Sequence, residues 1–129
     1  MKQIYTPEEW EAALEESKSG PIVIYKHSTA CAGCERQLSE MHEGVAYKEI
    51  TRPVYYVVVQ ESGELSKRIA DDLQIPHQSP QAIIVINGRA CYDAYADEIS
   101  ASVIAARIHL VQEAFDEISG SGSKTREEE

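Results

Sequence analysis

The stretch "IVIYKHSTACAGCERQ", residues 22–37, decides the fold that we expect of this chain. It begins with a β-branched, apolar run that is typical of a buried strand. Ser28 and Thr29 follow, and both are residue types that commonly cap helices. The remainder is polar and predicts a helix from about Cys31 to about His42. Two of the chain's three cysteines therefore lie where a strand is expected to give way to a helix.

The spacing of Cys31 and Cys34 suits thiol–disulfide chemistry. At a helix start, free N–H groups and the positive end of the helix dipole stabilise a thiolate, the reactive form of cysteine. Cys34 is expected one helical turn deeper, where its sulfur can reach that of Cys31. The pattern predicts that Cys31 attacks a substrate disulfide and that Cys34 then resolves the mixed disulfide.

Other interpretations of these residues stay open. A zinc site needs about four ligands, usually in two close pairs, whereas the chain adds only Cys91 and four scattered histidines. We therefore expect neither a metal nor another cofactor. Cys91 is expected to be a small buried hydrophobe, with a second resolving thiol as the alternative. His27 is either a structural histidine at the end of a strand or a residue that tunes the pKa of Cys31.

The rest of the chain predicts alternating helices and strands. Thr6, Pro7 and Glu9 form a capping-box pattern at a helix start, and Asn87-Gly88 predicts a type I′ turn. The expected helices span residues 7–19, 31–42, 63–75 and 97–118, and the expected strands span 22–25, 54–59, 82–86 and 89–95. Helices between strands imply parallel pairing, to which the turn adds an antiparallel hairpin. We expect one α/β domain over residues 1–118 and a flexible, Gly/Ser-rich and charged tail over 119–129.

The composition excludes several classes of partner. The net charge of −10 over 129 residues disfavours nucleic acid and anionic membranes, because the field of the protein repels phosphate. No apolar stretch approaches the roughly 20 residues that span a bilayer. The acidic, amphipathic N-terminus does not resemble a secretory signal, so the expected location is the cytoplasm. Thiols are kept reduced there, which favours a catalytic pair over a permanent disulfide.

These features resemble the thioredoxin superfamily and, more narrowly, a small bacterial group that includes the monothiol bacilliredoxins. Three segments carry the resemblance: "KHSTAC", residues 26–31, "YYVVVQESGELSKRIADDLQI", residues 55–75, and "HQSPQAIIVINGR", residues 77–89. The resemblance implies a thioredoxin-like three-layer sandwich, with a mixed sheet of about four strands flanked by helices.

The resemblance also implies a cis-proline that faces the reactive cysteine, a place that Pro80 occupies here. Pro80 and the backbone of Ser79 are thus expected to bind substrate, and Thr29 is a further candidate beside the cysteines. Tyr25 stands where thioredoxins keep a buried aspartate, so their proton shuttle is not expected. Cys34 is present where monothiol bacilliredoxins usually lack a cysteine, which permits a dithiol cycle.

The activity that the resemblance implies is reduction of mixed disulfides between protein cysteines and a low-molecular-weight thiol such as bacillithiol. Oxidised or S-thiolated proteins and the small thiol itself would be the partners. The alternative is a binding module or redox sensor that uses the same fold without turnover.

Overall fold

The computed structural model describes the backbone of residues 1–128 and the side chains of residues 1–119. The elements in chain order are β1 (Lys2–Gln3), α1 (Pro7–Glu16), β2 (Ile22–His27), α2 (Cys34–Ala46), β3 (Val54–Val58), α3 (Gly63–Leu73), β4 (Gln81–Ile86), β5 (Arg89–Tyr95), the short 3-10 helix η1 (Ala96–Glu98) and α4 (Ala101–Glu128).

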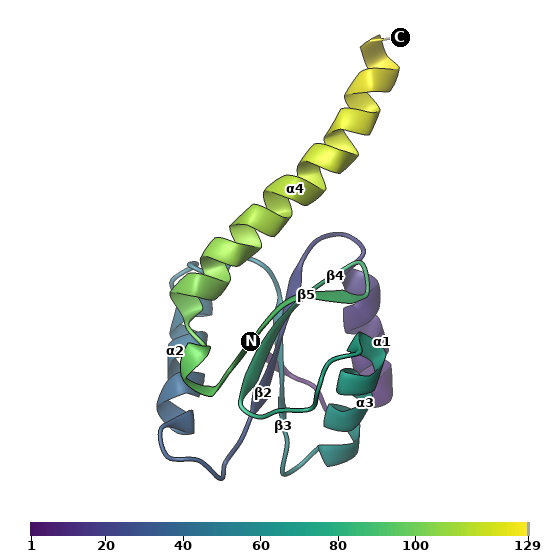
Figure 1. Cartoon of the computed structure of the whole chain (residues 1–129). Coiled ribbons are helices and arrows are strands. Elements are labelled where there is room, and N and C mark those ends of the chain that lie inside the picture. Colours follow the sequence, from purple (N-terminus) through teal and green to yellow (C-terminus); the bar gives the residue numbers. More distant parts are fainter. Residues whose placement is uncertain (129) are drawn as a thin grey trace.

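The strands of the described chain form one mixed sheet with β2 at its centre. The order across the sheet is β1-β3-β2-β4-β5. Strands β1, β3 and β2 are parallel, whereas β4 runs antiparallel to β2 and β5 antiparallel to β4. Helices α1 and α3 cover one face, and α2 with the first part of α4 covers the other (Figure 1). The expected thioredoxin-like three-layer sandwich is confirmed, with five strands rather than about four.

The additional strand, β1, is only two residues long, so no alternation of residue types marks it in the sequence. Lys2 pairs with Tyr55 of β3, and the N–H of Ile4 donates to the carbonyl of Tyr56 at 2.9 Å. Ile4 itself is fully buried. The tertiary contact with β3, rather than a local propensity, therefore creates this strand.

Strand β2 is buried along its whole length and contributes to both hydrophobic layers. Because side chains alternate across a strand, Ile22 and Ile24 pack beneath α1 and α3. Val23 and Tyr25 pack beneath α2 and α4. The strand is thus anchored from two sides, which holds its C-terminal end in a defined position.

The start of α1 is as predicted, but the start of α2 is not. The Thr6 hydroxyl accepts from the N–H of Glu9 at 3.1 Å, and the Glu9 carboxylate accepts from the N–H of Thr6 at 3.2 Å. Helix α2 begins at Cys34 instead of Cys31, and its N-cap is Gly33 at a φ of 87°. A left-handed residue ends the helical path, so the helix does not reach back to Ser28 or Thr29.

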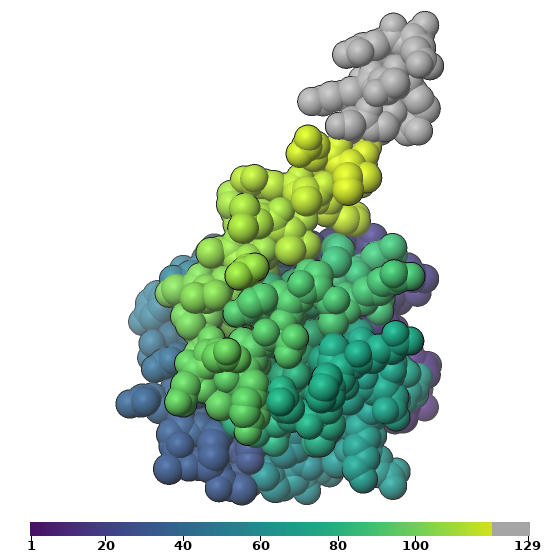
Figure 2. All heavy atoms as spheres, viewed as in Figure 1, coloured from purple at the N-terminus to yellow at the C-terminus, as the bar shows by residue number. Residues whose placement is uncertain are grey.

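The C-terminal helix also differs from the expectation. The chain makes the turn η1 before α4 begins at Ala101, because Ala96 has a φ of 53° and Ile99 is extended. Ile104 and Ile108 are buried, whereas Ile118 is 77% exposed. Helix α4 therefore buries apolar side chains against the domain near its start, and it then leaves the body of the molecule (Figures 1 and 2).

The backbone of α4 continues to Glu128, past the expected helix end at residue 118. The flexibility expected of residues 119–129 stays a prediction, and Glu129 lies outside the described residues. Within the part of the chain that the structure describes, no helix is long and apolar enough to cross a membrane.

Trp10 offers a direct test of the packing of α1 on α3. Its side chain is fully buried, and its indole N–H donates to the Asp72 carboxylate at 2.8 Å. Asp72→Ala leaves that buried donor without its partner, so we expect the free energy of unfolding to fall by about 1–2 kcal/mol. Urea unfolding followed by the fluorescence of Trp10, the single tryptophan, measures this change.

Asp71→Ala is the matched control, because Asp71 is exposed on the same helix. It should change the stability by less than about 0.5 kcal/mol. Equal effects of the two substitutions would contradict the assigned hydrogen bond.

Candidate functional site

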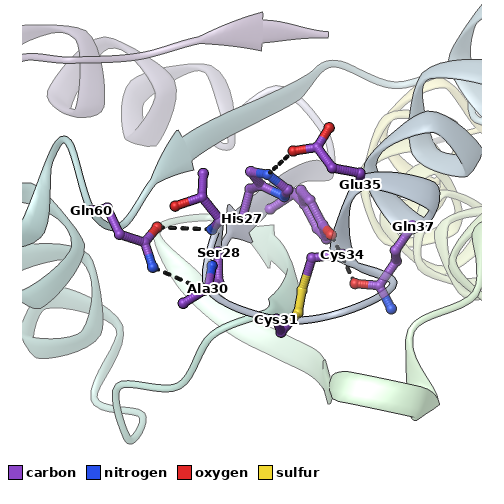
Figure 3. A network of polar contacts seen from close by, with 10 residues as sticks. His27, Ser28, Ala30, Cys31, Cys34, Glu35, Gln37 and Gln60 are labelled. Carbon is purple, nitrogen blue, oxygen red and sulfur yellow. Dashed lines mark hydrogen bonds and ion pairs between the residues drawn. A yellow bond between two sulfur atoms is a disulfide. The ribbon is translucent and has the colours of Figure 1, made fainter.

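The two cysteines lie where the chain leaves β2 and enters α2. They form a disulfide, with 5.6 Å between their Cα atoms (Figure 3). Cys31 is in the exposed bend that precedes the helix, whereas Cys34, the first residue of α2, is only 2% exposed. Although Cys31 is not itself helical, it lies three residues before the N-terminal end of α2. That distance along the chain does not depend on the disulfide, so the helix dipole favours a thiolate on Cys31 when the disulfide is opened.

A groove of about 550 Å³ runs beside the disulfide. Both cysteines line it, together with Ser79 and Pro80, and the peptide bond between these two residues is cis, as the resemblance implied. Its other walls come from the bend before α2, from α2 itself, from the end of β5 and from the turn that follows: Ala32, Gly33, Arg36, Gln37, Glu40, Tyr95, Ala96, Asp97 and Ile99. The structure thus brings Cys31, Cys34, Ser79 and Pro80 together.

Thr29 lies outside the groove lining, in the bend before Cys31. Its N–H donates to the Gln60 side-chain oxygen at 3.0 Å, and the Gln60 amide donates to the Ser28 hydroxyl at 3.0 Å (Figure 3). The same hydroxyl accepts from the N–H of Ala30 at 3.2 Å. Ser28 and Thr29 are therefore tied to the loop after β3, instead of capping a helix as the sequence predicted.

His27 is almost completely buried at the end of β2. Its Nε2 lies 3.3 Å from the Glu35 carboxylate, and its Nδ1 is buried without a partner in the described structure (Figure 3). The ring is thus engaged with the first turn of α2. An effect of His27 on the pKa of Cys31 remains a prediction.

A further polar contact joins β2 to α2. Buried Tyr25 donates from its hydroxyl to the side-chain oxygen of Gln37 at 2.7 Å, and the Gln37 amide donates to the carbonyl of Ala96 at 3.0 Å. Burial, followed by the charges of Glu35 and Glu40, raises the pKa of Tyr25. No sequence signal marked Gln37, because no motif surrounds it and its partners lie on other elements.

Lys26 points to the opposite face of the sheet from Tyr25, on the side of α1 and α3. It is fully buried, and its ammonium lies 3.3 Å from Nδ1 of His77. Burial lowers the pKa of Lys26 to about 8. Burial, then the charges of Lys26 and Lys67, also lowers the pKa of His77.

The expectation that Cys91 is buried is wrong, because Cys91 is exposed on the edge strand β5. Partial burial nevertheless raises the pKa of its thiol. The register places it far from the other cysteines: Gln81 lies opposite Lys26 at the groove end of the sheet, whereas Val85 lies opposite Ile22 at the other end. Ala90 lies opposite Val85 and Cys91 follows it at a register shift, so Cys91 is not placed to act as a second resolving thiol.

Among the described residues, no group of three or more histidine, cysteine or acidic side chains could hold a metal ion. The chemistry that the site offers is that of its sulfur atoms: one is exposed, and its partner is buried within bonding distance.

The buried ammonium of Lys26 predicts a pH dependence of stability. Between the folded pKa of about 8 and the ordinary value of 10.5, the unfolded chain binds a proton that the folded chain lacks. Stability therefore rises with pH in this window. Relative to that of Lys26→Met, the free energy of unfolding of the oxidised wild type should therefore rise by roughly 3 kcal/mol between these two pH values, at about 1.4 kcal/mol per pKa unit.

Chemical denaturation from pH 7 to 10.5 measures the difference in the free energy of unfolding between the wild type and Lys26→Met. The contributions of the other titrating groups cancel in this difference. Lys67→Met, at an exposed position, is the control, and its free energy of unfolding should change with pH as that of the wild type does. A constant difference between wild type and Lys26→Met would show that Lys26 keeps its ordinary pKa.

Comparisons with known proteins agree with the geometry of the site. Residues 2–104 match the family described as monothiol bacilliredoxin BrxC. A thioredoxin-fold protein proposed to be an oxidoreductase is 25% identical over 81% of this chain and 90% of its own, with a TM-score of 0.71. Thioredoxin from Fasciola hepatica is 16% identical over 86% of this chain and 99% of its own, with a TM-score of 0.66. The Schistosoma mansoni thioredoxin pre-protein is 18% identical over 84% of this chain and 95% of its own, with a TM-score of 0.65.

The two thioredoxins show a shared fold, and the family match covers most of the domain. The chain departs from the name of its family in having Cys34 as a bonded partner of Cys31. The fold, the cysteine pair and the family match support a thiol oxidoreductase role. This chain belongs to the monothiol bacilliredoxin family and has the thioredoxin fold.

Proposed function

We propose that this protein reduces mixed disulfides between protein cysteines and a low-molecular-weight thiol such as bacillithiol. The observation that carries the proposal is the unequal burial of two bonded sulfurs beside a groove. Cys31 is exposed and Cys34 is 2% exposed, and both line the groove with Pro80. An exposed sulfur can meet a substrate disulfide, while a buried one within bonding distance can reach only its neighbour.

The first step is attack by the Cys31 thiolate on the small-thiol sulfur of the substrate disulfide. A new disulfide forms between Cys31 and the small thiol, and the substrate disulfide breaks. The protein cysteine leaves as a thiolate and takes up a proton from water. The helix start at Cys34 stabilises the attacking thiolate.

In the second step, the Cys34 thiolate attacks the sulfur of Cys31. The small thiol leaves and takes up a proton, and the disulfide seen in the structure forms. The substrate has then gained two electrons and two protons, which the cysteine pair has lost. A separate thiol reductant must return them, and a reducing compartment such as the cytoplasm suits this cycle.

In this proposal, the segment that contains Ser79 and Pro80 holds the substrate chain. Both residues line the groove, and backbone groups of an irregular segment can pair with an extended peptide. Thr29 lies at the exposed approach to Cys31 and is a further contact. His27, buried against Glu35, would influence the thiolate through the first turn of α2.

Single cysteine substitutions separate the two steps. In a Cys91→Ser background, we expect Cys31→Ser to lose turnover of a bacillithiolated protein, because no exposed nucleophile remains. Cys34→Ser should instead accumulate an adduct of one small-thiol molecule on Cys31, because the resolving sulfur is gone. Turnover assays with intact-protein mass spectrometry measure both outcomes, and Cys91→Ser alone should match the wild type.

Turnover that survives in Cys31→Ser would rule out the proposed nucleophile. If the wild type forms the adduct and the disulfide but shows no turnover, the binding module or redox sensor is the better description. A parallel series with glutathionylated protein and with protein disulfides identifies the substrate class.

A further inference from the structure

We propose that Gln37 is a positioning residue that sets the spacing of the groove walls and so determines how tightly a substrate disulfide is held. The inference rests on the proposed function. Its basis is a chain of hydrogen bonds that runs from Tyr25 to Gln37, from Gln37 to Ala96, and from Ala96 to Pro80. Three of these four residues line the groove, each in a different segment of the chain.

Gln37 uses both ends of its amide. The oxygen accepts from the Tyr25 hydroxyl at 2.7 Å, and the nitrogen donates to the carbonyl of Ala96 at 3.0 Å. Tyr25 is fully buried in the central strand, so it is a fixed point. With its oxygen bound to this fixed donor, the Gln37 amide presents an N–H to the carbonyl of Ala96, so the two hydrogen bonds together orient the side chain.

Ala96 connects Gln37 to the segment that contains Pro80. Its N–H donates to the carbonyl of Pro80 at 3.1 Å, while its own carbonyl accepts from Gln37. The residue has a φ of 53°, a left-handed conformation that a side-chain-bearing residue adopts only where its surroundings hold it. The turn after β5 therefore connects α2 to the Pro80 wall, and Gln37 provides its attachment to α2.

The connection contains no group that titrates in the working range. A glutamine amide is neutral, and the Tyr25 hydroxyl stays protonated because its burial raises its pKa. Neither group can then take the part of the buried aspartate of thioredoxins as a proton acceptor. Loss of the connection should weaken substrate binding and leave the pH profile of turnover unchanged, a combination that a proton-transfer role would not produce.

Steady-state kinetics of Gln37→Leu and Tyr25→Phe test the inference, with Gln112→Leu, on α4 and outside the groove lining, as the matched control. We expect Gln37→Leu to raise KM for the S-thiolated protein about fivefold, with kcat within twofold and its pH profile unchanged. Tyr25→Phe removes only the anchor and should raise KM about twofold. The control should leave KM unchanged.

Hydrogen exchange of the Ala96 amide gives a readout without substrate. We expect exchange about fivefold faster in Gln37→Leu and an intermediate rate in Tyr25→Phe, because the N–H bonded to Pro80 is protected only while the turn is held. Normal KM in both variants, or an unchanged Ala96 exchange rate, overturns the inference. A wild type without turnover would instead refute the proposed function, and the exchange rates would still decide whether Gln37 holds the turn.

Discussion

The way in which the chain leaves the buried strand β2 is the constraint on which the site depends. Regular structure stops at His27 and resumes only at Cys34, where Gly33 provides a left-handed N-cap at a φ of 87°. A side chain at Gly33 would meet no neighbouring atom but would be strained in that conformation by about 1–2 kcal/mol. The bend before Gly33 keeps Cys31 in solvent, while the helix after it buries Cys34.

Polar groups with defined partners hold this arrangement in place. Gln60 braces the bend from the β3 side, His27 contacts the first turn of α2 through Glu35, and Gln37 joins α2 to the turn after β5. The contacts of Gln60 and Gln37 join segments far apart in the sequence, whereas His27 and Glu35 are eight residues apart. Because a buried polar group is costly without a partner, such contacts favour one arrangement of the groove over alternatives.

Much of the fold could be predicted from the sequence because its signals are local. The β-branched runs predicted strands β2, β3 and β4, and the pattern from Thr6 to Glu9 predicted the capping box of α1. Asn87-Gly88 gave the hairpin between β4 and β5. Residues 31 and 34 stood out by type and spacing, and the cis peptide bond before Pro80 followed from the resemblance.

What the sequence could not show depends on tertiary contact or on backbone conformation. Strand β1 exists through its pairing with β3, and the start of α2 depends on the φ of Gly33. The exposure of Cys91 follows from its place on an edge strand, a feature of topology that its apolar neighbours concealed. Gln37 has no motif around it, and its partners lie on other elements.

The central claim is that exposure, together with thiolate stabilisation by the start of α2, makes Cys31 the reactive member of the pair, and the alkylation rate of each cysteine tests it most directly. The reduced protein would be treated at pH 7 with limiting iodoacetamide, and its peptides mapped by mass spectrometry over time. The account predicts modification of Cys31 at least about tenfold faster than that of Cys34 or Cys91, since thiolate character and exposure coincide only there. Equal rates at Cys31 and Cys34, or a faster reaction at Cys91, would contradict it.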